Sequence, residues 1–166
     1  MTRVQLWYPL VRQAVAELRP PTRSRMFWNF RYMDQTVVDY FQNTIGRHHV
    51  NIGTIPEWMF KTPKPVGYPR DPGATDYNYE QGTGLQLTDP SGRQFAQYQA
   101  RVFAWFTKGG FTDELGRYHS SGYHFKIDDW GVLNEPTFEH SIRVQQCTRI
   151  YDAVTTAITR IGRSTS

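Results

Sequence analysis

Two kinds of apolar pattern alternate along the 166 residues. Short runs rich in β-branched, aromatic and other apolar residues are typical of buried strands. These runs are Val4–Tyr8, His49–Ile55 and Trp130–Leu133. Longer segments in which apolar residues recur at spacings of three and four predict helices. These segments are 34–44, 95–105 and 141–161. The pattern therefore predicts the order strand, helix, strand, helix, strand, helix.

Capping and breaking residues predict where the helices begin and end. Asp34 is expected to be the N-cap of the first long helix, and Gly46 to end it. Asp89–Pro90 are expected to be the cap and first residue of the second helix, which Gly109–Gly110 end. Before these helices, Ala14–Leu18 is expected to add one helical turn.

Two longer connections interrupt this order. Pro56–Pro90 is rich in Pro, Gly, Tyr, Asp and Asn, and a connection of that length is usually functional or an insertion. Residues 111–125 are expected to form a loop or a small hairpin. Alternating helices and buried strands predict an α/β fold with a parallel sheet covered by helices. About three βα units are fewer than a closed eight-unit barrel needs, so we expect an incomplete barrel or a small open sheet.

Composition is that of one soluble globular domain spanning 1–166, with 39% hydrophobic and 20% charged residues. The net charge of +4 comes from dispersed Lys and Arg, which does not favour a nucleic-acid partner. A single cysteine, Cys147, excludes an intramolecular disulfide and a Cys-rich zinc site. No run approaches a membrane span, and the N-terminus lacks a signal-peptide pattern. We therefore expect no membrane partner, and the location of the protein stays unknown.

The segment Trp130–Pro136, WGVLNEP, carries the sharpest chemical signal. Its apolar strand delivers the amide of Asn134 and the carboxyl of Glu135 at its carboxyl end, where parallel α/β folds bind ligands. A glutamate shielded by the apolar groups of the strand is suited to act as a general acid. Asn134 is expected to donate a hydrogen bond to a substrate hydroxyl. The alternative interpretation is a polar turn that precedes a helix.

WGVLNEP, followed by EHS and by TRIYDAV, resembles the acid/base region of clan A glycoside hydrolases, and family 39 is the most similar. Further similar segments cover most of residues 4–161. They are FWNF, YMDQTVVDYF, VNIGTIPEWMF, WFTKGGFTDELG and HSSGYHFKIDDW.

This resemblance implies a (β/α)8 barrel that cleaves O-glycosidic bonds with retention. It assigns the acid/base role to Glu135, after the fourth strand, and contact with the sugar 2-hydroxyl to Asn134. The family's nucleophile lies on the seventh strand, which the chain is expected to lack because its last helix ends near Ile161. Glu57 is the nearest substitute in the sequence and a weak one. The chain is thus expected to be a fragment of a single catalytic barrel, inactive alone, with a carbohydrate substrate and no cofactor.

Other residues are candidates for the rim of a sugar site. Trp58 is expected to stack on a sugar, while Trp28 and Asn29 lie between a strand and a helix, where active-site loops gather. Packing is the alternative for each of them. His124, with His119, is expected near the cleft, but these and His140 lack metal-ligand spacing, so no metal is expected.

Three hypotheses follow. The chain is the acid/base-bearing part of a retaining glycosidase, or a truncated barrel that binds carbohydrate without cleaving it, or an unrelated open-sheet protein. An isolated half barrel leaves sheet edges exposed, which predicts self-association through those edges.

Overall fold

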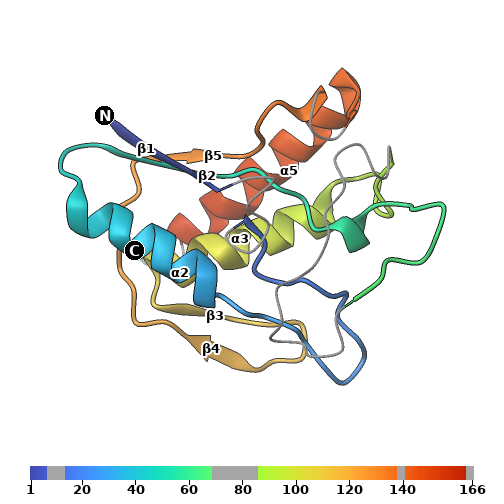
Figure 1. Ribbon diagram of the computed structural model, residues 1–166, viewed down its shortest axis with the longest axis horizontal. Coiled ribbons are helices and arrows are strands. Elements are labelled where there is room, and N and C mark those ends of the chain that lie inside the picture. The colour runs from blue at the N-terminus through green and yellow to red at the C-terminus, as the bar shows by residue number, and fades with distance from the viewer. Residues whose placement is uncertain (7–13, 69–85, 138–140, 164–166) are drawn as a thin grey trace.

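The computed structural model describes residues 1–6, 14–68, 86–137 and 141–163 (Figure 1). Strands and helices alternate along the chain in the predicted order. These elements are β1 (Thr2–Leu6), α2 (Arg31–Asn43), β2 (His48–Ile52), α3 (Arg93–Thr107), β5 (Asp129–Gly131) and α5 (Val144–Arg163). A short 3-10 helix, η1 (Glu57–Met59), follows β2, and β3 (Gly110–Thr112) and β4 (Tyr118–Ser120) form the hairpin expected within 111–125.

The strands β1, β2 and β5 form a parallel sheet in that spatial order. Val50, in the central strand, pairs with Val4 on one side and with Trp130 on the other. Leu6 and Ile52 pair at the carboxyl end of the sheet, and both are buried. Over the described ranges this sheet is open and has three strands. The prediction of a mixed α/β fold with a parallel sheet is therefore confirmed.

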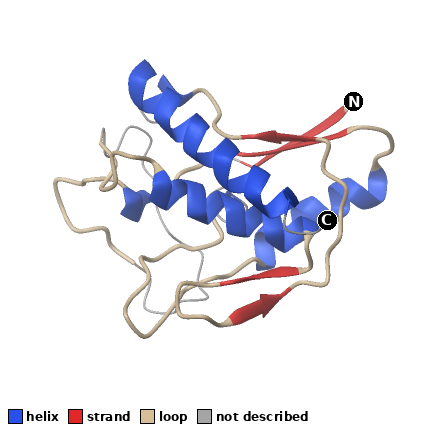
Figure 2. Ribbon diagram, turned by 180° about the vertical axis from the view of Figure 1, so that it is seen from behind, coloured by secondary structure: helices blue, strands red, loops and turns tan. Residues whose placement is uncertain are grey.

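Three layers are stacked in Figures 1 and 2. The parallel sheet lies on one side, the helices form the middle, and the hairpin of β3 and β4 lies on the far side of the helices. Helix α3 is central, because it contacts α5 and β3 as well as the sheet. The apolar core therefore lies on the face of the sheet that the helices cover.

A buried glutamine attaches α3 to two strands. The amide nitrogen of Gln99 donates to the carbonyl of Ile52 at 2.5 Å, and its amide oxygen accepts from Nε1 of Trp130 at 2.9 Å. Trp130 also packs edge-on against Phe103 of α3. These contacts orient the Trp130 side chain toward the helices.

The predicted start of the first long helix is wrong by several residues. Helix α2 begins at Arg31, whose amide donates to Oδ1 of Asn29 at 3.1 Å, so Asp34 lies in the first turn and is not the N-cap. The Asp34 carboxylate instead accepts from Nε1 of Trp105 at 2.7 Å. The carboxylate that the sequence suggested as a helix cap is therefore hydrogen-bonded to a residue of α3.

The predicted start of α3 also differs. Gly92, with φ +74°, is the N-cap, and Pro90 precedes the helix. Asp89 still accepts hydrogen bonds from the amides of Ser91 and Gln94, at 2.9 and 2.8 Å. Burial acts to raise the pKa of Asp89, but these bonds and that from the Ser91 hydroxyl outweigh it and lower the pKa. Asp89 thus stabilises the start of α3 from the turn that immediately precedes this helix.

Other differences concern short segments. Of the helical turn predicted over Ala14–Leu18, only Ala14 is helical, and Glu17 instead makes an antiparallel bridge with Trp28. The strand predicted over Val4–Tyr8 is observed as far as Leu6, and its last two residues lie outside the described residues. The long Pro/Gly-rich connection is likewise described only in part, without 69–85, and Phe60 bridges Leu87 across it.

Candidate functional site at the carboxyl edge of the parallel sheet

The face of the sheet opposite the helices is polar. In the register of the three strands, Arg3 pairs with His49 and His49 with Asp129, while Gln5 pairs with Asn51. Because side chains alternate across a strand, these residues share the face that the apolar pairs do not use. The described helices lie on the other face in both views (Figures 1 and 2). A row of polar side chains therefore leads toward the carboxyl edge of the sheet.

The chain segments at the ends of β2 and β5 approach each other closely at that edge. A Cβ atom on Gly53 would lie 2.6 Å from the amide nitrogen of Asn134, and one on Gly131 would lie 2.6 Å from Cγ of Asn51. Glycine at 53 therefore allows the two backbone segments to approach this closely, and glycine at 131 leaves room for the Asn51 side chain. The Asn51 side chain lies over Gly131, is 3% exposed, and its Oδ1 atom has no hydrogen-bond partner.

Asn134 and Glu135 follow β5 at this edge. Oδ1 of Asn134 accepts a long hydrogen bond, 3.5 Å, from Nη2 of Arg3 on the neighbouring polar face. Glu135 is exposed and has φ +37°, a left-handed conformation that costs a residue with a side chain some strain. Strain of this kind is common where a side chain is held for a function.

The prediction that the apolar groups of the strand shield Glu135 is wrong for this chain. Trp130 contacts α3, and Val132 is buried in the core, so both side chains serve the helix-covered face. The strand is also shorter than predicted, ending at Gly131, so Glu135 lies beyond its regular pairing. Shielding of this carboxyl thus requires groups other than those of β5.

The tryptophans expected at the rim make packing contacts. Trp58 donates from Nε1 to the carbonyl of Glu17 at 2.8 Å, and its ring packs partly buried against the core. Trp28 stacks on Phe30 and Tyr98, with both ring centroids 5.7 Å from its own. The structure thus shows Trp28 in the packing role that was the alternative to a rim position. Next to Trp28, Asn29 is half-buried and uses its side chain to hold the first turn of α2.

His124 is not brought to the edge that carries Asn134 and Glu135. It is exposed and lies beside Gly109, where a Cβ atom would be 2.9 Å from its Cε1. The next residue, Phe125, stacks on Phe41 at 4.4 Å, and Phe41 packs against His48 at the start of β2. His124 thus lies near the amino edge of the sheet.

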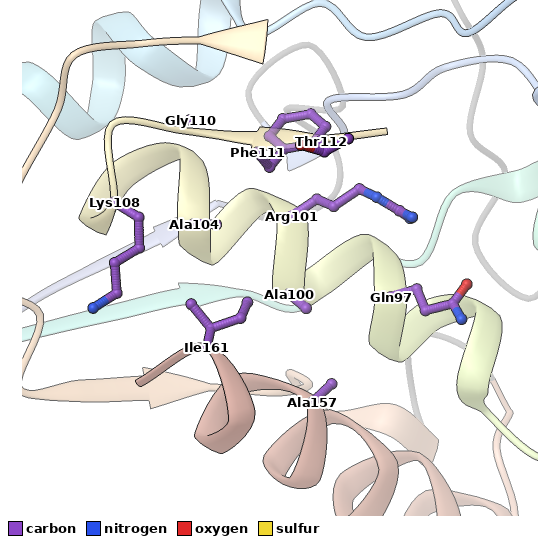
Figure 3. A pocket seen from close by; sticks show the side chains of 10 residues that line it. All are labelled: Gln97, Ala100, Arg101, Ala104, Lys108, Gly110, Phe111, Thr112, Ala157 and Ile161. Atoms are coloured by element: carbon purple, nitrogen blue, oxygen red, sulfur yellow. The ribbon is translucent and has the colours of Figure 1, made fainter. Parts of the chain in front are cut away.

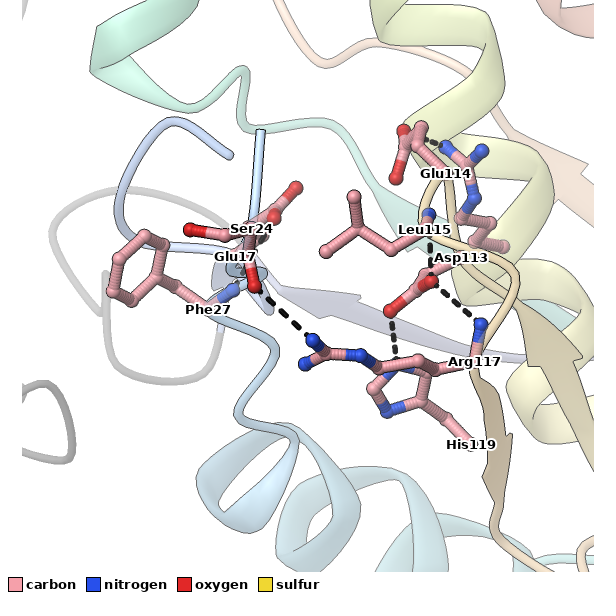
Figure 4. Close-up of polar contacts among 9 residues, drawn as sticks. Glu17, Ser24, Phe27, Asp113, Glu114, Leu115, Arg117 and His119 are labelled. Atoms are coloured by element: carbon pink, nitrogen blue, oxygen red, sulfur yellow. Dashed lines mark hydrogen bonds and ion pairs between the residues drawn. The ribbon is translucent and has the colours of Figure 1, made fainter. Parts of the chain in front are cut away.

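A second polar cluster, on the helix-covered side, was missed by the sequence analysis (Figure 4). Oδ2 of Asp113 lies 2.8 Å from Nε2 of His119, and its Oδ1 accepts from the amides of Leu115 and Arg117. Burial acts to raise the pKa of Asp113, but these hydrogen bonds outweigh it and hold the pKa below its ordinary value. His119 thus has a carboxylate partner in the hairpin and is not part of the sheet edge.

Glu17 belongs to the same region and behaves in the opposite way. It is 2% exposed, and desolvation raises its pKa to about 8, against a long hydrogen bond from the Phe27 amide that lowers it. The charges of Glu114 and Arg101 act on it with opposite signs. A carboxyl that is kept protonated by burial is a candidate acid, but a substrate cannot reach a side chain so enclosed.

The polar face had a signal in the sequence. Arg3 and Gln5 alternate with apolar residues in TRVQL, and His49 and Asn51 do so in HVNI, which is the period of a two-faced strand. The prediction of a buried strand over His49–Ile55 did not take this alternation of polar and apolar residues into account. Glu17 had no comparable signal, because its burial depends on residues distant in the sequence.

Among the residues that the structure describes, no group of three or more His, Cys, Asp and Glu side chains is arranged to hold a metal ion. No helix in the same ranges combines the length and the apolar character needed to cross a membrane. The geometry thus defines a class, an α/β chain whose open parallel sheet carries an amide and a carboxyl at its carboxyl edge. Comparison with family models, curated proteins and solved structures found no match for the chain.

Proposed function

We propose that this chain is the acid/base-bearing part of a retaining glycoside hydrolase barrel, with Glu135 as the general acid and base. The observation that carries the proposal is the position of Asn134 and Glu135, which lie a few residues beyond the end of β5 at the carboxyl edge of a parallel sheet. In barrels built from parallel strands, catalytic groups lie at that edge. The resemblance of WGVLNEP and its flanking segments to family 39 supports the same assignment.

The polar face of the sheet supports the barrel interpretation. Three parallel strands with helices on one side form an arc, and closing the arc with further strands would turn Arg3, Gln5 and Asn51 toward the barrel interior. Those further strands would also shield Glu135, which this chain leaves exposed. The outer sides of β1 and β5 are unpaired within the described sheet, and we propose them as the edges where strands are added.

The chemistry needs two carboxyl groups about 5–5.5 Å apart. Glu135 protonates the oxygen of the leaving group and then removes a proton from the attacking water. Asn134 binds the hydroxyl next to the reacting carbon. The nucleophile is proposed to be a glutamate on a strand outside this chain. Glu57 is a poor substitute, since it is 8% exposed within η1.

The test is made in a protein that contains this chain together with the strands that complete the barrel. Glu135→Gln should lower kcat/KM by about 10²–10⁴-fold for glycosides whose leaving group needs protonation. Aryl glycosides with an acidic phenol as the leaving group should lose much less in the glycosylation step, because that phenolate leaves without a proton. Asp39→Asn, at an exposed position of α2, is the matched control and should leave both rates unchanged.

Equal losses for both kinds of leaving group, or unchanged hydrolysis, would reject the acid/base role. The exposure of Glu135 favours a second candidate, a carbohydrate-binding domain without catalysis. That candidate predicts saturable binding of oligosaccharides to the 166-residue chain, mapped to Asn134 and Arg3 by NMR, with no hydrolysis in the completed barrel.

A further inference from the structure

A small cleft of about 200 Å³ lies where three segments meet: the segment after η1, the segment before α3 and the start of α5. Its charged lining consists of Lys61, Arg143 and Arg149, and no acidic side chain of the described residues lines it. Uncharged residues complete the lining, namely Gln86, Leu87, Pro90, Gln145 and Gln146. Three positive charges from segments that are distant in sequence therefore share one cleft.

The three cations of the cleft are exposed and available to a ligand. Within the described ranges, no hydrogen bond or ion pair joins the side chain of Lys61, Arg143 or Arg149 to another residue. The nearby Asp89 already accepts hydrogen bonds at the start of α3, and Asp152 lines a different hollow. Because like charges repel, a cluster of this kind is more stable when an anion lies between its members.

Two of these cations lie at an unfavourable end of a helix. Arg143 immediately precedes α5, and Arg149 lies in the second turn of that helix. The dipole of a helix favours anions near its amino end and cations near its carboxyl end. The first turn of α5 contains no acidic residue that would offset the arginines. An anion bound beside them would relieve both this conflict and the repulsion between the cations.

Backbone contacts hold the walls of the cleft in place. The amide of Lys61 donates to the carbonyl of Gln86 at 2.8 Å. A Cβ atom on Gly92 would lie only 3.1 Å from Cα of Ile150, so the start of α3 packs directly against α5. Figure 1 shows both helices beginning on the same side of the molecule. The cleft is therefore formed before a ligand arrives, which reduces the cost of binding.

A larger hollow of about 570 Å³, between α3, α5 and β3, is built differently (Figure 3). Its lining is rich in alanine and includes two cations, Arg101 and Lys108. Arg101 is ion-paired with Glu114, and Lys108 also has an interaction within the protein. The cations of that hollow are thus already engaged, whereas those of the small cleft are not.

The lining of the small cleft fits a phosphate group. Arginine binds phosphate oxygens through its planar fork of N–H donors, and lysine adds a point charge. The side-chain amides of Gln86, Gln145 and Gln146 can donate to the remaining oxygens. The cleft is smaller than the roughly 300–1,000 Å³ of sites for drug-sized ligands, so it suits a single charged group. A dianion uses three cations more fully than a carboxylate does.

We propose that the cleft of Lys61, Arg143 and Arg149 binds a phosphate dianion, either the free ion or the phosphate group of a small ester. This site is independent of the proposed glycosidase chemistry. The 166-residue chain is titrated with inorganic phosphate at constant ionic strength and about pH 7.5, where phosphate groups are largely dianionic. Amide NMR should show saturable shifts centred on Lys61, Gln86 and the start of α5. Acetate, a monoanion, should bind at least about tenfold more weakly.

Arginine variants test the cleft directly. Arg149→Gln should weaken phosphate binding about three- to tenfold, as expected for the loss of one partly exposed charged hydrogen bond. Combining it with Arg143→Gln should remove saturable binding. Arg23→Gln is the matched control, because it removes the same charge from an exposed position outside the cleft and should leave the affinity unchanged.

Glycerol phosphate distinguishes the two sources of the phosphate group. Affinity equal to or higher than that of inorganic phosphate assigns the cleft to esters, and exclusion of the ester assigns it to the free ion. Non-saturating shifts with both phosphates would overturn the proposal. So would equal affinity for acetate and phosphate, or equal losses in Arg149→Gln and Arg23→Gln. Circular dichroism of each variant checks that the chain is folded.

Discussion

Two glutamates show how differently this molecule treats its carboxyl groups. Glu135 is exposed at the carboxyl edge of the sheet, on a strained residue beside Asn134. Glu17 is enclosed between the segment 14–30, α3 and the hairpin, where desolvation raises its pKa to about 8. The carboxyl whose pKa burial raises is thus inaccessible, and the accessible carboxyl lies at the edge of the sheet where we propose the site. A raised pKa therefore does not by itself mark an accessible carboxyl in this chain.

The contrast predicts that changes near Glu17 alter stability, while changes at Glu135 alter chemistry and leave stability nearly unchanged. The expected effect on stability decreases from Glu17→Gln through Gly53→Ala and Asp113→Asn to Glu135→Gln.

The largest effect is expected for Glu17→Gln and depends on pH. Because the folded-state pKa lies near 8 and the ordinary value is 4.5, the protonated carboxyl stabilises the fold fully below 4.5, and this is lost as pH rises through 8. The parent should lose roughly 2–4 kcal/mol from this group between about pH 5 and pH 9, and the glutamine variant should not. Urea unfolding across that range measures it, and parallel pH profiles would contradict the burial argument.

A smaller effect is expected for Gly53→Ala. The new Cβ atom would lie 2.6 Å from the Asn134 amide nitrogen and 3.0 Å from the Leu133 carbonyl carbon, so the backbone that carries Glu135 must move. We expect a loss of about 1–3 kcal/mol in unfolding free energy. Gly67→Ala is the control, since nothing lies within 4 Å of its Cβ position. Similar unfolding free energies for the two variants would show that the two strand ends do not pack as described.

Asp113→Asn should be destabilising by about 1–2 kcal/mol at neutral pH, because an amide replaces the acceptor of three hydrogen bonds in the hairpin. The pKa of Asp113 is lowered in the folded state, so its contribution is present above the ordinary value of 3.8 and is lost as pH falls through the folded-state pKa. The destabilisation caused by the variant should therefore shrink in acid. Thermal unfolding of the parent and the variant at neutral and acidic pH tests this. A destabilisation that grows in acid would contradict the lowered pKa of Asp113.

The smallest effect on stability is expected for Glu135→Gln in this chain. The side chain is exposed, so the unfolding free energy should change by less than about 0.5 kcal/mol. Glu135→Gly is the companion variant, because glycine adopts φ +37° without the strain of a side chain and should be neutral or slightly stabilising. A large loss on Glu135→Gln would mean that this carboxyl supports the fold, which would weaken its assignment to chemistry.

The sequence supported the broad architecture well. The order of strands and helices follows from hydrophobic period and from β-branched runs, and these signals are local. Helix boundaries were predicted less accurately. Asp34 was predicted to be an N-cap, but its carboxylate accepts a hydrogen bond from Trp105, 71 residues away in the sequence. The same limit applies to Trp28, which was considered for the rim and is stacked among core rings.

The same distinction between local signals and long-range contacts applies to the candidate site. That an amide and a carboxyl stand at 134 and 135, after an apolar strand, could be predicted from neighbouring residues alone. The folded chain was needed to show that Trp130 turns to the helices and that Glu135 is exposed. The burial of Glu17 and the close approach of Gly53 to Asn134 likewise depend on the fold. Solvent exposure and close approach depend on which distant segments pack together, and no local pattern of residues records that.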